Sequence, residues 1–303
     1  SYQNFEIIVI DDGSTDNSLD LVKTIGCDKV KIVINEHNIG LAASRNRGLE
    51  VAEGDYIALM DCDDVSFPHR FATQVAYLEA NPDCGMVSSH YITFRNDLET
   101  GKRSIKKVPT NCDYIAARLL FQSVICCPCV MLRSRTLHQH NLMFNETLRV
   151  CEDWDMWYRV SKVARVANID DTLLYYLKHG NNLSNKRTLM HQNKIKIIQN
   201  SLLDHGVDVR DLFDDGSFIK DEESYSEFVY RIELFCKEKV KKGEYVDGFI
   251  KKACAYLIYE IYKSSVDKIG LSAYRVLRKS SLYSDVNMKI KDRMRSYIKS
   301  KFC

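Results

Sequence analysis

Short apolar runs alternate with amphipathic stretches along the first 180 residues. Residues 5–10 form a nearly continuous apolar run rich in β-branched side chains, as in a strand buried on both faces. Leu19, Val22 and Ile25 then recur at the spacing of one helical face. Strands alternating with helices of this length predict an α/β fold with a mainly parallel sheet. Further strands are predicted at 30–34, 56–60, 85–94, 124–132, 164–169 and 172–177, and helices at 41–52, 68–80, 113–121 and 152–163.

The hydrophobic pattern changes after residue 183. Apolar side chains now recur at helical spacing without strand-like runs, as at Ile195, Ile198 and Leu202 and again at Phe228 and Ile232. We therefore expect an α/β domain over residues 1–183 and a helical region over residues 184–303.

The last predicted helix is basic. It could lie on an anionic membrane surface, which would make the protein peripheral at the inner face of the membrane, or it could be an ordinary solvated helix face. Its basic residues are Lys289, Lys291, Arg293, Arg295, Lys299 and Lys301, with Met294, Tyr297, Ile298 and Phe302 between them.

Composition narrows the class of protein. With 43 basic and 41 acidic side chains, the chain lacks the positive excess of a nucleic-acid-binding protein. The 11 cysteines are irregularly spaced, which fits reduced thiols in a cytoplasmic protein. The densest cysteine segment, residues 126–129, could bind a metal or provide buried structural thiols. The second interpretation is favoured because the paired spacing of closed zinc sites is missing.

Three carboxylates, Asp61, Asp63 and Asp64, directly follow the apolar run at 56–60. Like charges this close raise each other's pKa, and a divalent cation removes that cost. Carboxylates suit hard ions such as Mg2+ and Mn2+. Ligands of open α/β sheets bind at the carboxyl ends of strands, so we expect a metal and nucleotide site here.

Three further residues are candidates for chemistry. Asp12 follows the first predicted strand and could accept hydrogen bonds from a base or ribose, or belong to a helix cap. Arg45 could face a phosphate or an acidic cluster, or lie on the surface. Asp153 begins a predicted helix beside Trp154 and Trp157. The helix dipole stabilises an acid there, while desolvation by the tryptophans would raise its proton affinity, as a general base requires.

These residues belong to motifs that occur in a definite order and spacing. The motifs are Tyr2-Gln3-Asn4-Phe5-Glu6, Asp12-Gly13-Ser14, Asn38-x-Gly40, Ala43-x-Arg45-Asn46-x-Gly48, Gly54-Asp55-Tyr56-Ile57, Asp61-x-Asp63-Asp64 and Glu152-Asp153.

In this combination the chain resembles family 2 glycosyltransferases of the GT-A fold, over about residues 1–180. The resemblance implies an enzyme that moves a sugar from a nucleotide-sugar donor, by default a UDP-sugar, with inversion of the anomeric carbon. It implies Mn2+ or Mg2+ as cofactor. The acceptor would be a saccharide or glycolipid hydroxyl in polysaccharide, lipopolysaccharide or glycolipid synthesis.

The resemblance also assigns roles within the donor site. Asp12 would contact the nucleobase, and Asp61 would contact the ribose or uridine. Asp63 would hold the metal that bridges to the diphosphate, with Asp64 as a supporting acid. Arg45, in the motif Ala43-x-Arg45-Asn46-x-Gly48, would belong to the residues that bind the nucleotide sugar.

Two residues near the reacting groups complete the resemblance. Asp153 occupies the place of the family's catalytic base. His179 falls near a histidine that some members use to bind metal or diphosphate, although it could equally be an exposed loop histidine. The tryptophans beside Asp153 could stack on a sugar face, though packing is their commoner role.

The chain differs from the family in one respect, and two alternative functions remain open. Family members open with a further strand and helix before the equivalent of Tyr2, so we expect this chain to be truncated at its N-terminus relative to them. A catalytically impaired nucleotide-sugar or carbohydrate-binding module is one alternative to the enzyme. A Rossmann dehydrogenase is a weak alternative because no Gly-x-Gly-x-x-Gly follows the first predicted strand.

Overall fold

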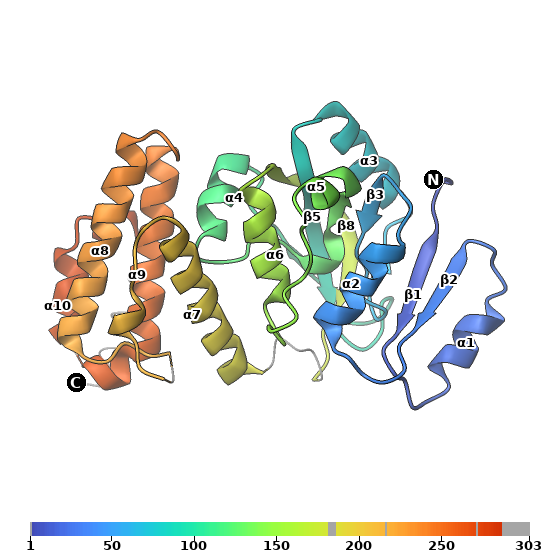
Figure 1. The fold of residues 1–303 in the computed structure, drawn as a ribbon, viewed down its shortest axis with the longest axis horizontal. Helices are drawn as coiled ribbons and strands as arrows, with labels where there is room; N and C mark the ends of the chain where they lie inside the picture. The colour runs from blue at the N-terminus through green and yellow to red at the C-terminus, as the bar shows by residue number, and fades with distance from the viewer. Residues whose placement is uncertain (1, 181–185, 216, 271, 287–303) are drawn as a thin grey trace. The chain divides into compact units, whose positions relative to one another are not determined.

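The computed structural model describes residues 2–180, 186–215, 217–270 and 272–286, and the chain divides into two compact units (Figure 1). The first unit comprises Ser1–Ile115 and Ser123–Arg187, and the second comprises Ala116–Gln122 and Thr188–Cys303. The second unit thus takes in a short segment from the middle of the predicted α/β domain. The predicted basic C-terminal helix lies outside the described residues, so membrane contact stays a prediction.

The first unit contains alternating strands and helices. Another helix, α4 (Cys112–Leu119), begins in the first unit and ends in the second. The elements of the first unit are β1 (Ile7–Asp11), α1 (Ser18–Thr24), β2 (Val30–Ile34), α2 (Leu41–Val51), β3 (Tyr56–Ala58), β4 (Val65–Ser66), α3 (Arg70–Ala80), β5 (Cys84–Phe94), β6 (Ser104–Lys106), η1 (Cys127–Cys129), β7 (Met131–Arg133), α5 (Ser134–Gln139), α6 (Glu152–Ser161) and β8 (Arg165–Leu177).

The strands form two sheets. In one, β1 and β2 pair in parallel. The other has the order β3-β7-β5-β8-β4, with β6 also paired to β5. In this second sheet β5 and β8 are parallel, whereas the other four pairings are antiparallel. The predicted α/β class is confirmed, but the second sheet is mixed rather than mainly parallel. The antiparallel pairings could not be predicted because they involve β4, β6 and β7, which are only two or three residues long.

The longest pairing joins β5 and β8, which lie side by side in the middle of the first unit (Figure 1). Two strands were predicted at 164–169 and 172–177, and the structure has one strand across both. Asp170 and Asp171 interrupt the apolar pattern, and the register skips them, because Ser89 pairs with Ile169 and His90 pairs with Thr172. A β-bulge in a continuous strand therefore looked like a boundary between two strands.

The strand predicted at 124–132 is largely a loop and one helical turn. Pro128 has no backbone N–H to donate to a sheet and instead lies in the 3-10 turn η1. Only Met131–Arg133 pairs with neighbouring strands. This turn places residues 126–129 beside the end of β3, where the candidate site lies.

A buried core holds α3 against the second sheet. Leu78 on α3 packs with Cys84 and Val87 on β5, Met131 on β7 and Ala167 on β8, and all are at most 3% exposed. Each fully buried large aliphatic side chain contributes roughly 1.5–3 kcal/mol to folding. The core fixes the end of β3 and the loops that follow it.

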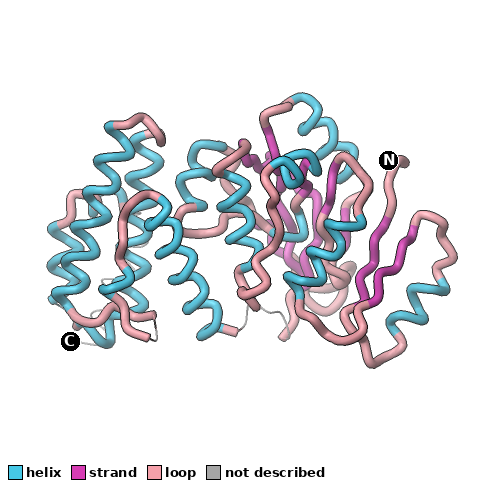
Figure 2. The backbone as a smooth tube through the Cα atoms, in the orientation of Figure 1, coloured by secondary structure: helices cyan, strands magenta, loops and turns pink. Residues whose placement is uncertain are grey.

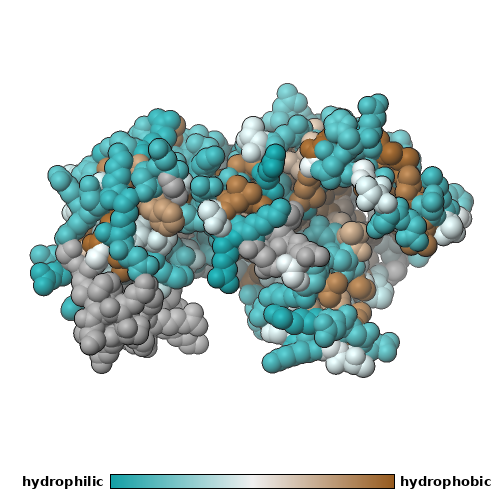
Figure 3. Space-filling view, turned by 90° about the horizontal axis from the view of Figure 1, so that it is seen from below, coloured by the Kyte–Doolittle hydropathy of each residue, from teal (hydrophilic) through white to brown (hydrophobic). Residues whose placement is uncertain are grey.

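The first 51 residues bury less apolar surface than this core. Helix α1 has no buried residue. Ile7 on β1, Leu21 on α1 and Ile34 on β2 are 43%, 57% and 50% exposed. On the face drawn in Figure 3, hydrophilic side chains predominate and hydrophobic ones form small scattered groups.

The second unit is helical, as the apolar periodicity predicted, and every strand named above lies in the first unit (Figure 2). A bilayer-spanning helix is not found among the described residues. The helical elements from Arg187 onward are α7 (Arg187–Asp204), η3 (Arg210–Leu212), α8 (Glu222–Lys241), α9 (Asp247–Ile269), α10 (Ser272–Lys279) and η4 (Tyr283–Asp285).

Candidate active site

The carboxylate segment 61–64 begins just after β3 and is anchored by a buried arginine. Arg70, at the start of α3, is fully buried and donates to the carbonyl oxygens of Leu59 at 2.9 Å and Val130 at 3.2 Å. Gln74, one turn later, donates to the carbonyl of Cys129 at 2.7 Å. These bonds tie the end of β3 to the turn η1, and so fix the acidic segment against residues 126–130.

Asp64 is the buried member of the segment. Its Oδ1 accepts a hydrogen bond from the backbone N–H of Leu177 at 2.8 Å, while its Oδ2 is buried with no hydrogen-bond partner among the described residues. Burial raises the pKa of Asp64 to about 7, and the charges of Asp61 and Asp63 act in the same direction. A nearby cation would stabilise a carboxylate held this way, and the cation itself stays a prediction.

Asp63 lies beside His179. The Nε2 of His179 is 2.7 Å from Oδ2 of Asp63, and both side chains are about one-third exposed. The bond from Leu177 to Asp64 brings the end of β8 alongside the acidic segment, and His179 follows two residues later. An imidazole and a carboxylate therefore face solvent together, 116 positions apart in the sequence.

Arg45 joins the acidic segment to the start of α6. Its guanidinium contacts Glu152 at 2.7 Å and Asp61 at 3.3 Å, and its side chain is only 12% exposed. Burial opposes the charge of Arg45, but the negative groups around it, including Glu152 and Asp61, outweigh burial and raise its pKa. Of the options left open by the sequence, the structure shows Arg45 facing the acidic clusters.

Asp12 orders the loop that leads into α2. Its carboxylate accepts from the backbone N–H groups of Ile39 at 2.9 Å and Gly40 at 3.0 Å and from the Asn35 amide at 2.8 Å. Burial opposes ionisation, but these hydrogen bonds prevail and lower the pKa of Asp12. They use most of its acceptor sites, so its visible role is to hold this loop.

The loop also requires glycine at position 13. Gly13 has φ of +78°, and a Cβ there would lie 2.9 Å from the backbone nitrogen of Asn38. Both the left-handed conformation and the close contact exclude a larger side chain without a local shift. The Asp12-Gly13 pair thus closes the turn from β1 against residues 35–40.

Asp153 lies in the first turn of α6, next to Glu152. The preceding Cys151 has φ of +64°, a strained conformation for a residue with a side chain. The N–H of Trp154 donates to Oδ1 of Asp153 at 2.7 Å. Burial raises the pKa of Asp153, while the charge of Arg45 opposes that rise. A partly buried carboxylate of raised proton affinity is suited to general base catalysis.

The two tryptophans are part of the core. Trp154 is 3% exposed and Trp157 is fully buried, with its ring edge-to-face against Phe144 at 6.0 Å. Stacking on a sugar face is therefore wrong for both residues, because neither ring presents a face to solvent. Their contribution is the burial of the helix on which Asp153 lies.

The cysteine segment lies between the acidic groups. The neighbouring thiols of Cys126 and Cys129 influence each other, which raises the pKa of Cys126 and lowers that of Cys129. Burial raises the pKa of Cys127, opposed by the charge of Arg45 and reinforced by that of Asp153. Within the described part of the chain, no three His, Cys, Asp or Glu side chains are arranged to hold a metal ion. The interpretation of residues 126–129 as structural thiols stays a prediction.

The structure thus brings six of the seven predicted site residues into one connected region. Asp61, Arg45 and Asp153 meet at α6, and Asp63, Asp64 and His179 meet at the end of β8. Asp12 is linked to α2 through Asn35, whose amide also donates to Ser44 at 2.9 Å. No role was predicted for Glu152, Asn35 or Arg70, because each acts through contacts between segments distant in sequence.

Comparison with known proteins identifies the family. A family model described as glycosyl transferase family 2 matches residues 1–142. The amylovoran biosynthesis glycosyltransferase AmsE of Erwinia amylovora is 30% identical over 190 residues, which are 60% of this chain and 67% of AmsE.

The chain belongs to glycosyltransferase family 2. The prediction of a glycosyltransferase is therefore confirmed at the level of the family. This chain spans 59%, 57% and 67% of the length of three curated relatives that it matches, and AmsE is the third of them.

Two further comparisons concern ligands and fold. The relative WfaP of Escherichia coli is described as a UDP-Glc:α-D-GlcNAc-diphosphoundecaprenol β-1,3-glucosyltransferase. It is 28% identical over 187 residues, 61% of this family 2 chain and 70% of WfaP. The crystal structure of Staphylococcus aureus TarS residues 1–349 in complex with UDP-GlcNAc has a TM-score of 0.52 at 16% identity, covering 94% of this chain and 74% of that one. This likeness supports the GT-A fold.

Proposed function

We propose that the chain is a metal-dependent inverting glycosyltransferase that moves a sugar from a UDP-sugar to a hydroxyl group of a saccharide or glycolipid. The observation that carries the proposal is the bridge through Arg45, which contacts Asp61 on one side and Glu152, next to Asp153, on the other. One positive group thereby brings the predicted donor-binding acids and the predicted base into a single site.

The chemistry of the residues fits a divalent cation. Asp63 and His179 offer an oxygen and a nitrogen ligand side by side, and the neighbouring Asp64 adds negative charge behind them. Sites for Mg2+ that act on phosphates use one or two carboxylates, with substrate oxygens and water completing the shell. When bound, the cation would neutralise the charge that grows on the departing diphosphate.

The chain's own groups position the donor. The loop ordered by Asp12 lies at the start of α2, and the same helix carries Arg45. Asp61 is 38% exposed and keeps one oxygen outside its contact with Arg45. We assign the ribose contact to Asp61 and the nucleobase side to the loop at residues 12–13 and 35–40.

Asp153 acts as the general base. It takes the proton of the acceptor hydroxyl as that oxygen attacks the anomeric carbon. A single base and direct displacement invert the configuration at this carbon, by the same geometric logic as in inverting hydrolases. The charge of Arg45 opposes the effect of burial on the pKa of Asp153 and so favours the ionised form.

Relatives support the classes of substrate. TarS was crystallised with UDP-GlcNAc, and WfaP is described as acting with UDP-Glc on a sugar linked to diphosphoundecaprenol. AmsE is described as an enzyme of amylovoran biosynthesis. We therefore place the activity in the synthesis of a surface polysaccharide or glycolipid.

A catalytically silent nucleotide-sugar-binding module is the competing function. Nucleotide release from a panel of UDP-sugars, measured with Mn2+ and again with EDTA, separates the two. The enzyme releases UDP from at least one donor, and EDTA abolishes the release. Binding of a UDP-sugar with no release above the buffer blank would establish the module instead.

A further inference from the structure

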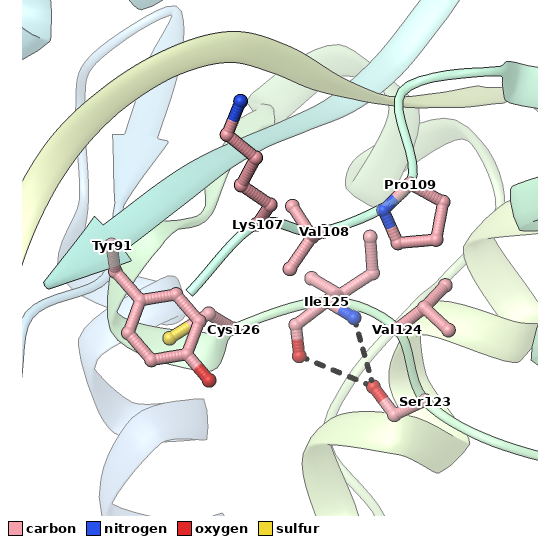
Figure 4. A pocket seen from close by; sticks show the side chains of 8 residues that line it. All are labelled: Tyr91, Lys107, Val108, Pro109, Ser123, Val124, Ile125 and Cys126. Carbon is pink, nitrogen blue, oxygen red and sulfur yellow. Dashed lines mark hydrogen bonds between the residues drawn. The ribbon is translucent and has the colours of Figure 1, made fainter. Parts of the chain in front are cut away.

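A pocket of about 250 Å³ opens beside the candidate active site within the first unit. It lies between the middle of β5 and two loops, one before α4 and one before η1. Figure 4 shows the lining side chains at close range. They are Tyr91, Lys107, Val108, Pro109, Ser123, Val124, Ile125 and Cys126.

The walls of this pocket are held in place by side chains that do not line it. Asn168 on β8 donates to the carbonyl of Pro109 at 2.7 Å and to that of Val124 at 3.3 Å, which ties the two loops together. The N–H of Val108 donates to Nδ1 of His90 at 3.2 Å, and Nε2 of His90 contacts Asp170 at 2.9 Å. The pocket is therefore built into the fold before any ligand arrives.

The lining suits an uncharged ligand with both apolar faces and hydroxyl groups. No carboxylate lines the pocket, and Figure 4 shows the ammonium end of Lys107 extending away from the other lining side chains. Tyr91 and Ser123 approach the pocket from opposite sides (Figure 4). The hydroxyl of Tyr91 has no hydrogen-bond partner among the described residues. A sugar ring matches this mixture of aromatic face, aliphatic surface and hydroxyl groups.

The pocket adjoins the reacting groups through its cysteine wall. Cys126 lines the pocket, and the next residue, Cys127, lies in the electrostatic field of Arg45, Asp153 and Asp61. The ring of Tyr91 packs edge-to-face against Tyr176 at 5.9 Å, one residue before Leu177, which binds Asp64. The pocket thus shares the segment 126–127 with the surroundings of Arg45, and its Tyr91 is linked to Asp64 through Tyr176 and Leu177.

We propose that this pocket binds the acceptor, as a neutral saccharide unit, and that Tyr91 and Val108 determine which acceptor is used. The proposal rests on the proposed sugar transfer. It places the acceptor ring between Tyr91 and the loop 107–109, with its reactive hydroxyl directed past Cys126 toward Asp153. The donor diphosphate lies on the other side, at Asp63 and His179, where the charged groups gather.

Two variants test the pocket. Tyr91→Phe removes one hydroxyl and should lower kcat/KM for the acceptor by about 3- to 10-fold, the effect of one lost neutral hydrogen bond. Val108→Phe fills the pocket and should lower it by more than 10-fold. Neither should change UDP release from the donor in the absence of acceptor by more than twofold. Val163→Phe, at a position 41% exposed, is the matched control and should leave both reactions unchanged.

Direct binding provides a readout that does not depend on turnover. The probes are methyl glycosides of glucose, galactose and N-acetylglucosamine, observed by saturation-transfer NMR on the full 303-residue chain. At least one should give a signal that Val108→Phe removes and Val163→Phe retains, even if no donor is turned over. Signals that survive in Val108→Phe would overturn the proposal. A rise in donor KM with an unchanged acceptor KM would also overturn it, since the pocket would then serve the donor.

Discussion

The guanidinium of Arg45 lies 2.7 Å from the Glu152 carboxylate, although the two residues are 107 positions apart in the sequence. Glu152 is 5% exposed, so the pair is almost completely buried. A buried charge without its partner is strongly unfavourable, which makes this contact sensitive to any substitution. It also sets the electrostatic environment of Asp153.

Arg45→Gln should move the acidic limb of the pH–rate profile to higher pH. Asp153 must be deprotonated to act as a base, and its pKa is already raised by burial. The charge of Arg45 opposes this rise, so its removal raises the pKa of Asp153 further and shrinks the active fraction at low pH. The measurement is kcat between pH 5 and pH 9. Arg165→Gln, at an exposed arginine on β8, is the control and should leave the limb in place.

The cation site can be tested through His179. Loss of one of two protein ligands should raise the Mn2+ concentration for half-maximal activity by about 10-fold or more in His179→Ala, with partial recovery at saturating Mn2+. His69→Ala is the control, because His69 is a half-exposed histidine that contacts Asp171 away from the acidic segment. Identical Mn2+ titrations of both variants and wild type would show that His179 does not bind the cation.

Arg70 should matter for stability. Replacing it with leucine leaves the carbonyls of Leu59 and Val130 without their donor in the interior. Each buried acceptor left unpaired costs about 1–3 kcal/mol, so Arg70→Leu should lower the free energy of unfolding by about 3 kcal/mol. Urea unfolding of the variant, beside Arg165→Leu as an exposed control, measures this. Equal midpoints for the two variants would show that the buried bonds contribute little.

Gly13→Ala should weaken donor binding and lower the free energy of unfolding by about 1–2 kcal/mol, because the backbone at this position is left-handed. The added Cβ meets the backbone of Asn38, at the loop that Asp12 holds. Displacement of that loop disturbs the proposed nucleoside side of the site. UDP affinity by calorimetry should fall by about 10-fold or more, whereas Gly248→Ala, where a Cβ meets nothing within 4 Å, should bind UDP as wild type does. Unchanged UDP affinity in Gly13→Ala would show that this loop does not contribute to binding of the nucleoside.

The sequence predicted the parts of this molecule that depend on local pattern. The apolar run before Asp61 and the helix after Cys151 were both predicted, because burial and helix starts leave short-range signals. The resemblance assigns Asp12, Asp63 and Asp153 to one site, and the structure brings Asp63 and Asp153, but not Asp12, into the connected region around Arg45 and His179. Short strands such as β6 and β7 left no comparable signal.

Contacts between residues that are distant in the sequence could not be predicted from it. Nothing local marks Glu152 as the partner of Arg45, or Arg70 as the buried donor that fixes β3. The face of Trp157 could not be assigned either, since periodicity does not say whether an aromatic ring lines a site or fills a core. The pocket proposed for the acceptor depends on Asn168, which lies more than 40 residues from both loops that it joins.

The central claim is that Asp153 is the base of a sugar transfer. The most direct measurement compares UDP release with Mn2+ for wild type, Asp153→Asn and the exposed control Asp113→Asn, each with a UDP-sugar that wild type turns over. Loss of a general base lowers the rate by about 10²–10⁴-fold. We predict that loss for Asp153→Asn, with unchanged UDP binding by calorimetry and wild-type rates for Asp113→Asn. Equal rates for all three proteins would contradict the assignment.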